Sequence, residues 1–134
     1  MNAKDKYEYW LEHAQYDFRA AEVMLNSGMW VYAVFMCQQA IEKLAKGTYG
    51  LFVDADNVPR VHSIARLMKA FEEKLPEPVK DEYFVLFETL SGYYLNNRYP
   101  DFKNRLANAT TEEEARGLYG QAKEVFAWLQ TLKP

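Results

Sequence analysis

The sequence is poor in cysteine and histidine, and this scarcity excludes several kinds of site. The single cysteine, Cys37, cannot form an internal disulfide, so nothing points to an oxidising compartment. The two histidines, His13 and His62, belong to no Cys/His cluster with the spacing of zinc ligands. A glycine-rich phosphate loop, an HExxH motif and a GxSxG motif are also absent. We therefore predict no metal site, no cofactor and no catalytic residue of these types.

Long apolar runs and an excess of basic residues are missing too. The longest strongly apolar stretch, Met29 to Cys37, is far too short to span a bilayer, and the first residues do not resemble a signal peptide. We expect a cytoplasmic protein without membrane contact. The formal net charge is −3, so the chain is not built to coat nucleic acid by its overall charge. A local basic pocket is compatible with that charge.

Aromatic residues, by contrast, are abundant. The 134 residues are 49% hydrophobic and 16% aromatic, which is ample for the core of one domain, and we predict a single domain over residues 1–134. Bundle cores usually favour Leu and Ala. Some of the rings are therefore expected at a surface that another molecule covers.

Apolar residues recur at steps of three and four along most of the chain, which is the spacing of amphipathic helices. We predict an all-α fold, an up-and-down antiparallel bundle of four or five helices. Ser27-Gly28 forms a very short join, so the first two helices should be antiparallel neighbours. Pro78 suits the first turn of the fourth helix. The predicted helices span residues 4–26, 29–51, 62–74, 78–94 and 111–132, and residues 102–109 are predicted to be a loop.

The second predicted helix is apolar on more than one face, so it should lie centrally or meet another subunit. Along it Gln38, Glu42 and Lys46 recur at four-residue steps, with Gln39 and Lys43 on the adjacent row. A solvated face with a Glu42–Lys46 pair is the simplest interpretation. It fits poorly with a helix that has neighbours on several sides, because polar groups facing neighbours need partners.

A second polar feature follows the fourth predicted helix. Tyr94 precedes the run Arg98-Tyr99-Pro100-Asp101, in which Pro100 disfavours a helical conformation for Tyr99. Arg98 can cap helix carbonyls, or it can present a fixed guanidinium to a phosphate or carboxylate. The spacing leaves both interpretations open. His62, at the start of the third helix, is likewise either solvated or functional.

Taken together, and in their order along the chain, these features resemble a HEPN domain (higher eukaryotes and prokaryotes nucleotide-binding). The first helix contains Trp10, Ala14, Asp17 and Ala21; residues 38–46 resemble the family's QQAxEKxxK signature; and residues 98–101 resemble its RYPD turn. His62 follows the loop between them. The resemblance covers about residues 7 to 130.

The resemblance implies a helical bundle that is commonly a homodimer and is often encoded beside a minimal nucleotidyltransferase. It also implies contact with a nucleotide or RNA near the polar groups of the second helix and the Arg of the turn. The residues expected to bind the ligand are Gln39, Glu42, Lys43, Lys46, His62 and Arg98. Those expected to form the structural turn are Tyr94, Tyr99, Pro100 and Asp101.

One departure from the family bears on catalysis. Many HEPN proteins are metal-independent ribonucleases with an Arg, a polar residue directly after it, and a His four to six residues further on. Here Tyr99 follows Arg98 and no histidine occurs after His62. We therefore predict a binding module that is not an enzyme on its own and works with a minimal nucleotidyltransferase or in a toxin–antitoxin pair. The alternatives are a divergent ribonuclease using Arg98 with His62, or a purely structural dimerisation bundle with Gln38, Gln39, Glu42 and Arg98 in one polar network.

Overall fold

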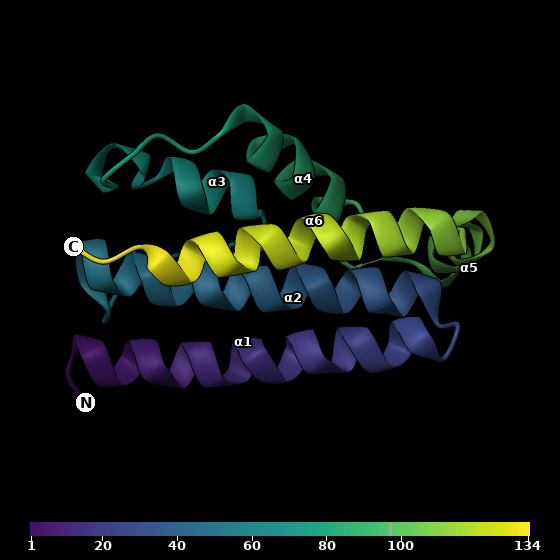
Figure 1. Cartoon of the computed structure of the whole chain (residues 1–134), viewed down its shortest axis with the longest axis horizontal. Coiled ribbons are helices and arrows are strands. Elements are labelled where there is room, and N and C mark those ends of the chain that lie inside the picture. The colour runs from purple at the N-terminus through teal and green to yellow at the C-terminus, as the bar shows by residue number, and fades with distance from the viewer. Residues whose placement is uncertain (97) are drawn as a thin grey trace.

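Three long helices form the body of the molecule (Figure 1). The computed structural model describes residues 1–96 and 98–134. Helix α1 (Ala3–Asn26) runs antiparallel to α2 (Trp30–Tyr49), and α6 (Glu112–Thr131) lies beside them in the same direction as α2. The predicted all-α bundle is confirmed. Of the residues described, none forms a helix that is both long and apolar enough to cross a membrane.

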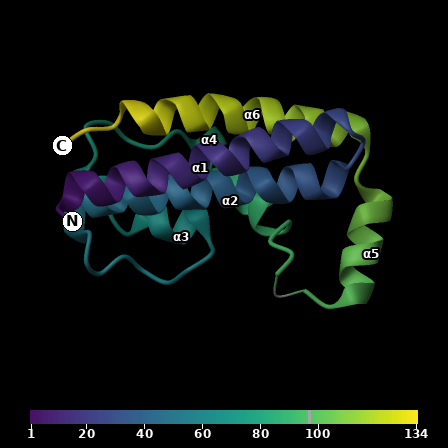
Figure 2. The same cartoon turned by 90° about the horizontal axis from the view of Figure 1, so that it is seen from below.

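Three shorter helices complete the fold. Helices α3 (Ile64–Lys69) and α4 (Asp81–Ser91) pack on α2 and on each other. Helix α5 (Pro100–Ala109) lies across the end of the bundle where α1 turns into α2 (Figure 2). A π-helical turn, η1 (Gly50–Asp54), extends α2, and a 3-10 turn, η2 (Glu72–Lys74), follows α3.

The join between α1 and α2 is as short as predicted. Ser27 caps α1, and Gly28 has a φ of 79°, in the left-handed region where a residue without a Cβ is least strained. The antiparallel pairing of α1 and α2 is therefore confirmed. On α1 the heptad-spaced Tyr7, Ala14 and Ala21 are buried, as the periodicity predicts.

Helix α2 is the central element, which confirms the first of the two predictions made for it. It packs against α1, α3, α4, α5 and α6. Its polar residues Gln38 and Glu42 are as deeply buried as the apolar seam around them. They are therefore obliged to find partners inside the protein.

Two of the predicted helices are shorter in the structure. The third begins at Ile64, after Ser63 accepts a hydrogen bond from the Arg66 N–H, and its α-helical part ends at Lys69. The fourth begins at Asp81, so the prediction that Pro78 lies in its first turn was wrong. The Val79 N–H donates to the Glu72 carboxylate at 3.2 Å, which keeps this segment outside the helix. The fourth helix ends at Ser91, short of the predicted Tyr94.

The loop predicted over residues 102–109 is a helix, α5. Pro100 is its first residue, where a missing N–H leaves no bond unmade, and Asp101 places a carboxylate near the positive end of the helix dipole. Three of the four residues predicted as a structural turn, Tyr99, Pro100 and Asp101, thus form the start of a helix with Tyr99 at the N-cap, whereas Tyr94 lies between α4 and α5. The helix ends before Thr110, and Thr111 caps α6 by accepting from the Glu114 N–H, as predicted. Asn97, predicted to precede this segment in a loop, lies outside the described residues.

Candidate functional site

A buried carboxylate on α2 organises the polar residues of the second helix. Glu42 is only 6% exposed. Its Oε1 accepts from Gln38 Nε2 at 2.9 Å and its Oε2 accepts from Lys46 Nζ at 2.9 Å. The four-residue spacing places these three side chains on one face of the helix, as predicted. Because the Lys46 side chain is only 12% exposed, the two charges neutralise each other largely away from water.

His62 joins this carboxylate from the segment before α3. Its Nδ1 lies 3.3 Å from both oxygens of Glu42. A carboxylate only accepts hydrogen bonds, so this contact places a hydrogen on Nδ1, and in the neutral imidazole Nε2 is then the acceptor. The Tyr94 hydroxyl lies 3.1 Å from Nε2, and the two rings are stacked with centroids 4.2 Å apart. We call the connected side chains the Glu42 network: Gln38, Gln39, Glu42, Lys46, His62 and Tyr94.

Gln38 connects the network to the backbone of the segment before α3. This side chain is fully buried, and its Nε2 donates to the His62 carbonyl oxygen at 3.2 Å as well as to Glu42. Its Oε1 accepts from Gln39 Nε2 at 2.7 Å. The amide therefore fixes both the carboxylate and the chain segment that supplies the histidine.

Two residues predicted at the same site have different surroundings. Lys43 forms an ion pair with Asp17 of α1 at 2.5 Å, across the α1–α2 contact. Arg98 donates from Nη2 to the Ser91 carbonyl at 3.4 Å, and its guanidinium lies 4.8 Å from the centroid of the Phe102 ring. Ser91 is the last residue of α4, so this contact is helix capping, one of the two interpretations left open for Arg98.

The structure therefore brings together Gln39, Glu42, Lys46 and His62, but not the whole predicted set. Among the described residues, Arg98 has no hydrogen bond or ion pair with the Glu42 network, and no acceptor contacts its buried Nε. Tyr94 is the member of the network closest to Arg98 along the chain. Tyr99 is 84% exposed and lies at the start of α5 with Pro100 and Asp101.

A pocket of about 370 Å³ opens beside the Glu42 network. Trp10 of α1 and Lys46 of α2 line it, and the segment between η1 and α3 supplies the rest of its wall. That segment is anchored by an ion pair from Lys6 to Asp56 at one end and by the Gln38 bond to His62 at the other. The residues of the segment that line the pocket are Val58, Pro59, Arg60 and His62.

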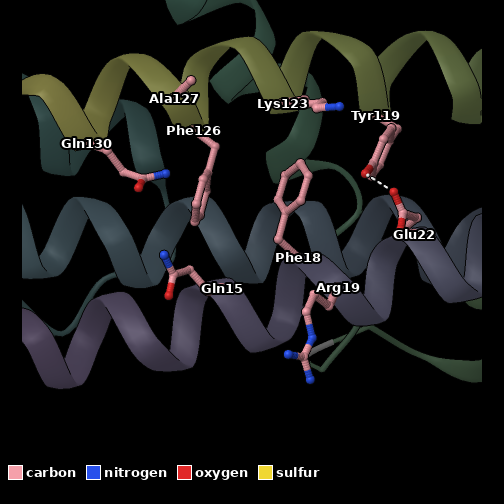
Figure 3. A pocket seen from close by; sticks show the side chains of 9 residues that line it. All are labelled: Gln15, Phe18, Arg19, Glu22, Tyr119, Lys123, Phe126, Ala127 and Gln130. Atoms are coloured by element: carbon pink, nitrogen blue, oxygen red, sulfur yellow. Dashed lines mark hydrogen bonds between the residues drawn. The ribbon is translucent and has the colours of Figure 1, made fainter.

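A larger groove of about 500 Å³ runs between α1 and α6 (Figure 3). Phe18 of α1 packs against Tyr119 and Phe126 of α6, with centroids 5.1 and 5.0 Å apart. The Tyr119 hydroxyl donates to Glu22 at 3.2 Å. Burial, and then this carboxylate, raise the pKa of Tyr119 to about 12. None of the ligand-binding residues predicted from the sequence lines this groove.

Cys37 lies in the apolar core of α2 and is fully buried. Burial raises the pKa of its thiol to about 12, so the reactive thiolate is not formed near neutral pH. This agrees with the packing role that its place in the apolar seam indicates.

Three residues of the site were not assigned from the sequence. Asp17 is the partner of Lys43, and the available signal was its acidic side chain on the otherwise apolar stripe between Ala14 and Ala21. Trp10 and Arg60 line the pocket. No local pattern marks Arg60, because its place depends on how the loop folds back against α1 and α2.

The comparisons define the family. A family model for the HEPN domain matches residues 7–132, and the chain belongs to this family. Over 98% of both chains, it is 28% identical to TT1696 from Thermus thermophilus, whose crystal structure superposes with a TM-score of 0.77. An archaeal HEPN homologue, ST0689, has the same fold at 22% identity, with a TM-score of 0.70 over 98% of this chain and 97% of that one. No curated protein matches the sequence.

Proposed function

We propose that this HEPN-family chain is a binding module for a nucleotide or an RNA end and is not an enzyme by itself. The observation that supports this is the buried Glu42 carboxylate, which fixes the Lys46 ammonium and the His62 imidazole on the wall of one pocket. Lys46 donates one of its three N–H groups to Glu42 and keeps the others for an anion. Gln39 supports this arrangement through Gln38.

The contacts of Arg98 favour binding over cleavage. A ribonuclease of the common HEPN type needs its Arg and His at the same phosphate, the Arg to stabilise charge and the His to move a proton. Arg98 caps α4 while His62 faces Glu42 and Tyr94. Incubation of the protein with tRNA in EDTA, beside Arg98→Ala, tests this point. Cleavage that disappears in the variant would favour the divergent ribonuclease instead.

We also propose that the module functions as a homodimer and serves a minimal nucleotidyltransferase or a toxin–antitoxin pair. Family membership supports the partner, and one face of α1 supports the dimer. Tyr9, Tyr16 and Val23 repeat every seven residues and are more than half exposed. They lie two positions after the buried Tyr7, Ala14 and Ala21, which is about 200° around the helix and thus faces away from the core. Such a stripe is typical of helix–helix contact.

Isothermal titration of the protein with ATP, GTP and a short RNA tests the binding proposal. Micromolar affinity also predicts that millimolar ligand stabilises the fold by about 4 kcal/mol in thermal unfolding. Lys46→Gln should weaken binding severalfold, whereas Lys74→Gln, which changes an exposed lysine in η2, should not. Absence of binding by all three ligands would argue against the proposal.

A further inference from the structure

The pocket beside the Glu42 network combines one aromatic side chain with three nitrogen-bearing side chains. The indole of Trp10 supplies the aromatic part, and Val58 and Pro59 add apolar surface. Lys46 and Arg60 supply the donors, and His62, whose two ring nitrogens face Glu42 and Tyr94, completes the lining. Such a lining fits a ligand that is planar at one end and anionic at the other, because bases stack on aromatic rings and phosphates pair with Lys and Arg.

The charges of the lining favour an anion. Glu42 neutralises Lys46, so Arg60 contributes the charge that remains at the pocket. Arg60 is exposed, and within the described part of the chain no carboxylate forms an ion pair with it. Its guanidinium therefore keeps all five N–H donors for a ligand.

The Trp10 side chain is closely packed at its base. A Cβ added at Gly47 of α2 would lie 2.8 Å from Trp10 Cβ, closer than side chains normally approach. The glycine thus allows α1 to come close to α2 at this level, and the close contact fixes where the indole begins. A stacking surface held in place loses little conformational freedom when a ligand binds.

The size of the pocket limits what fits. Ligand pockets typically measure about 300–1,000 Å³, and a pocket of about 370 Å³ lies at the lower end of that range. It suits one nucleotide rather than a longer stretch of RNA. A free mononucleotide and the terminal nucleotide of an RNA share this chemistry.

We infer that this pocket binds a single nucleotide, with its base stacked on Trp10 and its phosphate at Arg60 and Lys46. The inference rests on the proposed function and adds the site, the ligand size and the pose. Trp10 and Arg60 become the residues that recognise the two ends of the ligand. Lys46 and His62 are the two members of the Glu42 network that line this pocket, and Glu42 holds both in place.

The test uses the fluorescence of Trp10. In the full chain carrying Trp30→Phe and Trp128→Phe, Trp10 is the only tryptophan left, because the sequence has three. Titration with AMP and GMP should quench it saturably, with the dissociation constant that calorimetry gives for the unmodified chain. Adenosine, which lacks the phosphate, should bind at least tenfold more weakly. RNA trinucleotides with and without a 5′ phosphate distinguish an RNA end from a free mononucleotide.

Single substitutions distinguish a loss of ligand contacts from a loss of folding. Trp10→Ala should weaken AMP binding about tenfold or more, as loss of base stacking does, while Trp10→Phe should keep most of it. Arg60→Gln changes an exposed side chain, leaves the core intact, and should remove the preference for AMP over adenosine. Arg66→Gln, on the exposed face of α3, is the matched control and should change nothing.

The outcomes are distinguishable. If calorimetry detects nucleotide binding while Trp10 fluorescence is unchanged and Arg60→Gln binds as the unmodified chain does, the inference is wrong and the proposed function stands. If no nucleotide or trinucleotide binds at all, both are wrong.

Discussion

The imidazole of His62 stacks on the phenol ring of Tyr94, with their planes 17° from parallel. The contact joins the segment before α3 to the segment after α4, which are far apart in the sequence. Through His62 it also connects Tyr94 to the buried carboxylate of α2. The segments that precede α3 and follow α4 are thus both connected to α2 at Glu42.

This coupling is measurable by a double-mutant cycle of His62→Ala and Tyr94→Ala. Because the rings touch directly, we expect an interaction energy of about 0.5–1.5 kcal/mol in urea unfolding. Tyr94→Phe keeps the stack and loses only the hydroxyl, so it should retain most of that energy. Strictly additive single variants would show that the stacking contributes nothing to stability.

Loss of the Glu42 charge should destabilise the fold strongly. Glu42→Gln leaves the largely buried Lys46 without a counter-charge, and breaking a buried ion pair typically costs ~3–5 kcal/mol. Glu12→Gln, on the exposed surface of α1, is the control and should change the free energy of unfolding by less than about 0.5 kcal/mol. Equal stability of the two variants would contradict a structural role for the Glu42 carboxylate.

Two glycine substitutions should have opposite effects. Gly47→Ala forces a Cβ against Trp10 and should destabilise the protein by about 1–3 kcal/mol through overpacking. Gly120→Ala in α6 meets nothing within 4 Å, so the better helix propensity of Ala should stabilise it by up to about 1 kcal/mol. Thermal unfolding of both variants checks this. A neutral Gly47→Ala would mean that α1 and α2 are not so closely packed.

Stability should fall at alkaline pH, partly because of Cys37. Burial raises the pKa of this thiol from 9.0 to about 12, so above pH 9 the unfolded chain releases a proton that the folded chain keeps. The unfolded state then binds fewer protons, and the free energy of unfolding decreases as pH rises, by at most about 1.4 kcal/mol per pH unit for one group. Cys37→Ala should make that decrease shallower in urea unfolding between about pH 8 and pH 11. Parallel slopes for the two proteins would mean that the thiol is accessible.

The proposed dimer should depend on the exposed stripe of α1. Tyr16→Lys places a charge at its centre and should convert the dimer to a monomer in size-exclusion chromatography with light scattering. Val85→Lys, at a similarly exposed residue on α4, should leave the dimer intact. If the unmodified chain is a monomer at high micromolar concentration, the proposed dimer is wrong.

The long helices could be predicted from the sequence because each presents a continuous apolar stripe. The shorter ones could not be placed as well. Phe102 and Leu106 are the only apolar residues of helix α5 that are half-buried, and the signals that begin the helix, Pro100 and Asp101, are equally typical of a turn. The start of α4 depends on a hydrogen bond from Val79 to Glu72, which no periodicity reveals.

The site was predictable where its residues are neighbours on one helix. The Glu42–Lys46 pair follows from their spacing, and burial of Gln38 follows from the apolar faces of α2. The contact of His62 with Glu42 spans twenty residues and depends on the path of a loop. The same limit applies to Arg98, whose capping contact with Ser91 was one of two interpretations that spacing left open.

The segment that forms the outer wall of the pocket is fastened at Asp56 and at His62. Between those anchors, Val58, Pro59 and Arg60 form no hydrogen bond with any residue that the structure describes. A change of residue type in this short span therefore breaks neither a helix nor either anchor. Substitutions at these three residues should therefore change the outer wall of the pocket, and with it the ligand preference, while leaving Trp10, Lys46 and the bundle untouched.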